Sequence, residues 1–183
     1  MTAKREPADL SAVEAARLIA TGSLTAESLM RSCLERISHR EPLVEAFEHI
    51  ASDEALDQAR ALDRIPPRGP PHGLPFAAKD NYDTFDMSTT SGSPIYAGNR
   101  PTCDACTVAL PRGAGAILVG KTVTTEFAYV KPGKTRKSAR PDSRARWLVF
   151  VLRRAGDPYH QVSPTALARC CGAVIISASF LRA

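Results

Sequence analysis

Hydrophobic residues recur with a helical period in the first third of the chain. Ser11 and Glu14 form a capping-box pattern, which predicts an amphipathic helix running to about Ile19. Gly22 interrupts the pattern, and Thr25 is placed to cap a second helix. The apolar face of this second helix consists of Leu29, Cys33, Leu34 and Ile37.

Shorter elements follow. Residues 44–50 predict a strand, and Ser52 is placed to cap a helix that runs to about Asp63. The segment 65–73 is rich in proline and glycine, so we expect a connector without regular structure. Residues 74–78 form a short apolar run, which is typical of a buried strand.

The pattern continues with a polar loop at residues 89–94, a predicted helix at 104–112 and a second apolar strand at 116–119. Helices thus alternate with short apolar strands. This order predicts an α/β fold in which helices cover a sheet. From residue 134 onward the pattern of clear elements is lost.

The charge is distributed unevenly along the chain. Its 183 residues, 44% of them hydrophobic, suit one domain. The net charge of +5 combines about −3 for residues 1–133 with about +8 for residues 134–183. Such a basic tail indicates either contact with nucleic acid or an anionic membrane, or a different origin. The start of the chain has no targeting pattern, and the apolar run 147–152 is too short to span a membrane, so we expect a cytoplasmic protein.

Five cysteines are an odd number, which argues against a secreted disulfide framework. Cys103 and Cys106 have the C-x-x-C spacing of half a zinc site or a redox pair. No second pair lies at a suitable distance, and ordinary thiols are the favoured interpretation. The histidines are scattered, at His39, His49, His72 and His160. We therefore expect no metal and no cofactor.

Lys79 directly follows the predicted strand 74–78. A lysine at a strand end is usually an ordinary one with its ammonium group in water. Alternatively, a poorly solvated lysine has a lowered pKa and its neutral amine acts as a base. Residues 115–122 match the phosphate-loop pattern G-x-x-x-x-G-K-[ST], but their apolar middle predicts a strand, so nucleotide binding is disfavoured.

Three segments resemble motifs of the amidase-signature family. Residues 73–81 read Gly-Leu-Pro-Phe-Ala-Ala-Lys-Asp-Asn, residues 89–94 read Thr-Thr-Ser-Gly-Ser-Pro, and residues 113–128 contain Gly-Lys-Thr and Thr-Glu-Phe-Ala. They occur in the order and spacing of the family, and the similarity extends over residues 10–136.

The resemblance implies hydrolysis of carboxamide C–N bonds by a Ser–cis-Ser–Lys triad, without a metal or cofactor. Lys79 corresponds to the triad lysine, which relays a proton through the bridging serine to the nucleophilic serine. The implied fold is an α/β/α sandwich with a mixed sheet flanked by helices, which we expect to be incomplete in this chain. The implied substrate is a small-molecule amide, whose identity and binding residues the sequence does not indicate.

The sequence departs from the family where the two serines are expected. The family has a Gly-Gly-Ser-Ser stretch near residue 146, where residues 146–150 read Arg-Trp-Leu-Val-Phe. Residues 172–180 resemble the segment that carries the nucleophile, but Ala173 occupies the nucleophile position. An alanine side chain cannot attack a carbonyl carbon. We therefore expect a truncated and inactive amidase.

These observations divide the chain into an amidase-like portion at 1–136 and a divergent basic tail at 137–183. The tail is interpreted as a frameshifted continuation of the same domain. Residues 146–149 can be encoded CGG TGG CTC GTC, and reading one base later gives Gly-Gly-Ser-Ser. The alternative is a genuinely diverged tail.

A second hypothesis places the chain in another functional class. In this hypothesis the chain is a non-enzymatic remnant or binding module whose basic tail contacts nucleic acid or another anionic partner. We expect no membrane contact, and nucleic acid is a disfavoured partner. The sequence gives no indication of the oligomeric state or of whether the chain folds alone.

Overall fold

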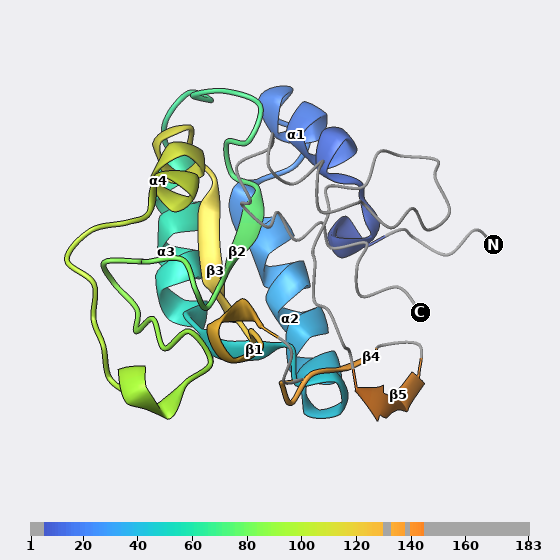
Figure 1. Ribbon diagram of the computed structural model, residues 1–183. Helices are drawn as coiled ribbons and strands as arrows, with labels where there is room; N and C mark the ends of the chain where they lie inside the picture. The colour runs from blue at the N-terminus through green and yellow to red at the C-terminus, as the bar shows by residue number, and fades with distance from the viewer. Residues whose placement is uncertain (1–5, 130–132, 138–139, 145–183) are drawn as a thin grey trace, which may run out of the picture.

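A three-stranded mixed sheet forms the centre of the molecule (Figure 1). The computed structural model describes residues 6–129, 133–137 and 140–144. The strand order is β1-β3-β2, and the strands are β1 (Phe47–Ile50), β2 (Pro75–Lys79) and β3 (Ile117–Thr122). β2 runs parallel to β3, whereas β1 is antiparallel to it. The predicted strands 74–78 and 116–119 are confirmed, each with its bounds shifted toward higher residue numbers.

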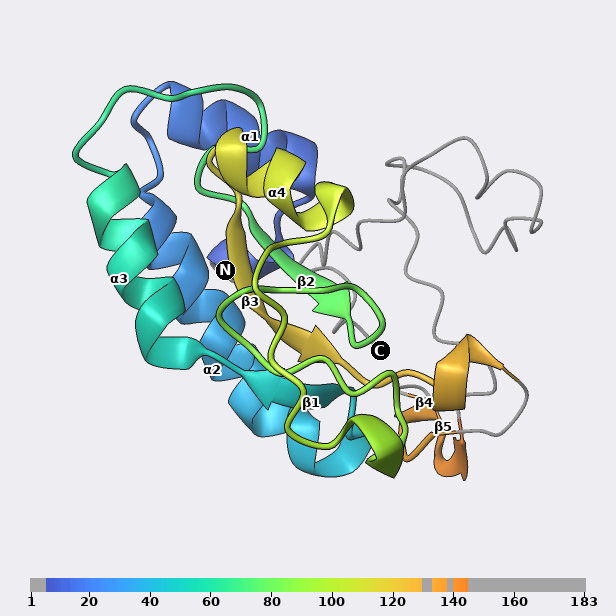
Figure 2. The same ribbon diagram turned by 60° about the vertical axis from the view of Figure 1, so that its left-hand side comes forward.

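Two helices, α2 (Ala26–Val44) and α3 (Ser52–Leu62), cover one face of this sheet (Figure 2). Side chains from both helices pack against β3 and Ala77 of β2. This cluster buries Ala26, Met30, Ile37, Val44, Ala46, Phe47, Ala55, Ala59, Ala77, Ile117 and Val119. The residues that α3 buries fully here are alanines, and its Leu56 and Leu62 pack partly buried against the same cluster.

The opposite face is covered by α4 (Cys106–Gly113) and by the loop that follows β2 (Figure 2). Its buried cluster consists of Ala51, Phe76, Ala78, Met87, Val108, Ala116 and Leu118. Helices therefore flank a mixed sheet on both sides, which confirms the α/β class expected from the sequence.

The capping box at Ser11 is present and begins α1 (Ala12–Ala20). The side chain of Thr25 accepts a hydrogen bond from the N–H of Ser28 and caps α2, as predicted. Helix α2 continues to Val44, so the strand predicted at 44–50 is shorter than expected and begins at Phe47. The carboxylate of Glu41 explains this boundary, because it accepts the N–H of Phe47 at 2.7 Å and fixes the turn into β1.

The helix predicted after Ser52 is confirmed, but Ser52 is its first residue and provides no side-chain cap. The remaining elements are short, namely η1 (Pro7–Asp9), η2 (Pro94–Tyr96), η3 (Glu126–Ala128), β4 (Arg136–Lys137) and β5 (Arg140–Arg144). Strands β4 and β5 pair with each other in an antiparallel hairpin. Among the described residues, no helix has the length and apolar character needed to cross a membrane.

Candidate active site at the ends of β2 and β3

Lys79 is the last residue of β2, as expected, and pairs with Thr122 of β3. Because the two strands are parallel, their carboxyl ends meet at one edge of the sheet, where open α/β sheets commonly bind ligands. Burial lowers the pKa of the half-buried Lys79 amine. No hydrogen bond or ion pair joins this amine to another described residue.

Asp80 connects the Lys79 segment to the loop 89–94. Its side chain is buried, and one carboxylate oxygen accepts hydrogen bonds from both the N–H and the hydroxyl of Thr90. The N–H of Ser91 donates to the Asp80 carbonyl at 2.9 Å. The N–H of Asp80 itself donates to the carbonyl of Thr122 at 2.9 Å. Both backbone groups of Asp80 are therefore fixed.

The loop 89–94 packs in turn against the segment that follows β3. Gly92 has a φ of +65°, and a Cβ atom there would lie 2.9 Å from the carbonyl oxygen of Thr124. The Ser93 hydroxyl donates to the Glu126 carboxylate at 2.8 Å. The three segments that resemble family motifs, which are separate in the sequence, therefore lie together in space.

Lys121 of β3 also belongs to this site, although in the sequence it appears only within the disfavoured phosphate-loop match and a family motif. Between the pair Phe76–Leu118 and the pair Ala77–Gly120 the register of β2 and β3 shifts, so that Val119 is an extra residue in β3. Such a bulge resets the alternation of side chains between the two faces of a strand. Lys121 is thereby directed to the face of Leu118 and the loop after β2, rather than toward α2 and α3.

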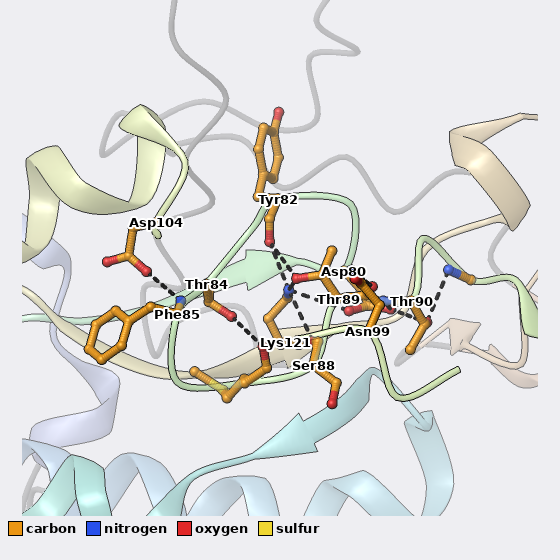
Figure 3. Close-up of polar contacts among 12 residues, drawn as sticks. Asp80, Tyr82, Thr84, Phe85, Ser88, Thr89, Thr90, Asn99, Asp104 and Lys121 are labelled. Atoms are coloured by element: carbon orange, nitrogen blue, oxygen red, sulfur yellow. Dashed lines mark hydrogen bonds and ion pairs between the residues drawn. The ribbon is translucent and has the colours of Figure 1, made fainter. Parts of the chain in front are cut away.

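The ammonium group of Lys121 is surrounded by oxygen atoms (Figure 3). It donates to the carbonyl of Tyr82 and to the hydroxyl of Thr89, both at 2.7 Å, and weakly to the carbonyl of Ser88 at 3.4 Å. The carboxylate of Asp80 lies 3.4 Å away, and both side chains are almost fully buried. Burial lowers the pKa of Lys121, and the negative charge of Asp80 opposes this shift.

One signal in the sequence marks Lys121, because this lysine follows the apolar run 116–119 after a single glycine. Periodicity alone places it on the wrong face, because the pattern does not reveal the bulge. The sequence pattern also does not identify the hydrogen-bond acceptors of Lys121, since they come from a loop without regular structure.

The other candidate residues do not assemble into a site. Cys103 and Cys106 are free, exposed thiols, and no group of metal-binding side chains occurs in the described part of the chain. Within the segment 115–122, residues 117–122 form β3, which agrees with the strand interpretation rather than with a phosphate loop. Ala173 and residues 146–150 lie outside the described residues.

The fold and the three joined segments define the amidase-signature class of α/β proteins. A family model described as Amidase matches residues 28–139, and the chain belongs to this family. A glutamyl-tRNA(Gln) amidotransferase subunit from Salinispora arenicola is 42% identical over 123 residues, which cover 65% of this chain and 25% of that protein. Its counterpart from Thermobifida fusca is 38% identical over 142 residues, covering 75% and 28%.

Solved structures give the same assignment. The native peptide amidase from Stenotrophomonas maltophilia matches with a TM-score of 0.63 and 28% identity, over 79% of this chain and 31% of that one. The chain thus spans about a quarter of the length of the curated relatives it matches and about a third of this amidase.

Proposed function

We propose that this chain carries the lysine-bearing portion of a hydrolase that cleaves carboxamide C–N bonds, with Lys79 as its proton-transfer group. The main support is the environment of Lys79: it ends β2, its pKa is lowered by burial, and its amine has no partner among the described residues. A lysine with a lowered pKa is suited to general base catalysis near neutral pH.

In the mechanism that the family resemblance implies, the neutral amine of Lys79 accepts a proton from a bridging serine. That serine deprotonates a second serine, whose oxygen attacks the amide carbon. The C–N bond breaks, the departing nitrogen takes up the proton, and water then cleaves the acyl-enzyme. Lys79 is regenerated when the proton has been passed on, so no other base is needed.

The substrate class follows from chemistry shared by the relatives. Their names describe a peptide amidase and part of an amidotransferase, both of which point to carbonyl–nitrogen bonds. We propose a carboxamide as the substrate. A panel of free glutamine, an amidated peptide and an anilide distinguishes a side-chain amide from a peptide-end amide and from an aryl amide.

We further propose that the chain with this sequence is inactive, with 1–136 as the amidase portion and 137–183 as a tail that departs from the family. By the family resemblance, residues 146–150 stand where the bridging serine is expected but contain no serine, and Ala173 stands at the expected nucleophile position. The codon relation at residues 146–149 supports a reading frame shifted over 137–171. The alternative, a binding module that uses the basic tail, has no support from the described residues or from the relatives.

The experiment begins with the coding DNA across residues 137–183. We expect the frame shifted by one base to encode Gly-Gly-Ser-Ser near residue 146; a shifted frame without this stretch refutes the frameshift. The unmodified chain should release no more product from the amide panel than its Lys79→Ala variant.

The frame-corrected gene is used to test whether the restored enzyme hydrolyses amides. Its product should hydrolyse at least one amide of the panel, and Lys79→Ala should lower the rate by several orders of magnitude, as loss of a triad member does. A frame-corrected enzyme that keeps its rate without Lys79 contradicts the proposed role of this lysine.

A further inference from the structure

Lys121 occupies an unusual position for a charged residue. Its side chain is 0% exposed, and it belongs to a central strand whose other residues are apolar, small or hydroxyl-bearing. A buried ammonium group is costly unless each of its N–H groups has an acceptor. The loop after β2 supplies these acceptors, through the Tyr82 carbonyl and the Thr89 hydroxyl.

These contacts tie down both ends of one loop. Tyr82 and Asp80 stand at its start, whereas Ser88 and Thr89 stand at its end (Figure 3). The Thr89 hydroxyl also donates to the Tyr82 carbonyl at 3.3 Å, so the two ends are joined directly as well. The buried ammonium group of Lys121 therefore holds the two ends of the loop 80–89 together.

The closed loop directly follows Lys79, the last residue of β2. The carbonyl of Lys79 accepts the N–H of Tyr82 at 2.9 Å, and the next residue, Asp80, is held by β3 and by Lys121. If the loop moved away from β3, the Lys121 ammonium would lose its acceptors in a place without water. The position of the Lys79 backbone is thus coupled to the contacts of Lys121.

We propose that Lys121 is a positioning residue for Lys79, holding the loop 80–89 closed so that the Lys79 amine is kept half-buried at the end of β2. This role rests on the proposed function of Lys79 as the proton-transfer group. Lys121 itself does not contact the reacting atoms; it acts through Asp80, Tyr82 and Thr89.

The test uses the titration of Lys79 in the chain as it exists. The protein is labelled with lysine carrying ¹³C at Cε, and the Lys79 signal is assigned by its loss in Lys79→Arg. The titration is compared in the unmodified protein, in Lys121→Met and in Thr89→Val. Lys134→Met serves as the charge control, because Lys134 forms a half-exposed ion pair with Glu48.

Thr89→Val removes one acceptor of Lys121 together with the Thr89–Tyr82 hydrogen bond, while keeping both charges of the Lys121–Asp80 pair, so the proposal requires a change in both variants. We expect the titration midpoint of Lys79 to rise toward that of a solvated lysine in Thr89→Val and to rise further in Lys121→Met. Lys134→Met should leave it unchanged. A purely structural Lys121 would lower stability without altering the Lys79 titration in protein that is still folded.

An unchanged Lys79 midpoint in folded Thr89→Val overturns the proposal, whether or not Lys121→Met folds. A Lys79 midpoint that changes in Lys121→Met but not in Thr89→Val overturns it as well, since the loss of a nearby positive charge then explains the change. No turnover is needed for this measurement. Failure of the positioning role is therefore distinguishable from failure of the proposed amide hydrolysis, which is tested on the frame-corrected enzyme.

Discussion

Replacing Lys121 with methionine should destabilise the fold strongly. Methionine has a similar length but no charge, so the buried carboxylate of Asp80 loses the cation that lies 3.4 Å away. Removing one partner of a buried ion pair typically costs ~3–5 kcal/mol, because the remaining charge is left unpaired in a place that water does not reach. The carbonyl of Tyr82 and the hydroxyl of Thr89 also lose a donor.

The assay is urea unfolding followed by circular dichroism, with Lys134→Met as the matched control. Lys134 lies 3.1 Å from Glu48, but both side chains are nearly half exposed, and such pairs contribute only about 0–1 kcal/mol. Adding Asp80→Asn to Lys121→Met should recover part of the loss, since the double variant no longer contains an unpaired buried carboxylate. The reasoning is refuted if Lys121→Met unfolds at the same urea concentration as Lys134→Met.

Three further predictions follow from burial and backbone geometry. Burial raises the pKa of Cys33 to about 12, so peptide mapping after brief alkylation at pH 8 should find Cys33 unmodified while the exposed Cys106 is labelled; equal labelling contradicts this. Gly92→Ala should lower the free energy of unfolding by ~1 kcal/mol more than Gly98→Ala, because both glycines have positive φ but only Gly92 lacks space for a Cβ atom; equal urea midpoints refute the clash. Burial lowers the folded-state pKa of Lys121, so between that pKa and 10.5 the unfolded chain binds more protons than the folded chain. The free energy of unfolding, relative to that of Lys121→Met, should therefore rise with pH in this window. A relative free energy that falls with pH contradicts the prediction.

Local signals made much of the fold predictable from the sequence. The capping box at Ser11 and the cap at Thr25 depend on contacts within three residues, and both are present. The boundary near Val44 was placed wrongly because it depends on the Glu41 side chain, which reaches forward to the N–H of Phe47. Ser52 has the residue type of a cap, yet it is already the first residue of α3 and Ala51 holds the cap position.

The candidate site was predictable only in part, and the reason is the bulge in β3. Lys79 was found because it ends an apolar run, and its place at the end of β2 is set by that run. Lys121 depends on the extra residue at Val119, which changes the face on which the side chain lies. Its hydrogen-bond acceptors come from residues 32–39 positions earlier in the chain, and no periodicity encodes such contacts.

The two lysines at the ends of β2 and β3 are the same chemical group in different environments, and this difference supports a division of roles. Burial lowers both pKa values, but only Lys121 has a carboxylate that opposes the shift. Lys121 also satisfies several oxygen acceptors, so losing its proton would leave a buried acceptor without a donor. Lys79 has no partner among the described residues, so its proton can leave without breaking a hydrogen bond within this part of the chain. The environment thus favours Lys121 as the fixed charge and Lys79 as the group that exchanges a proton.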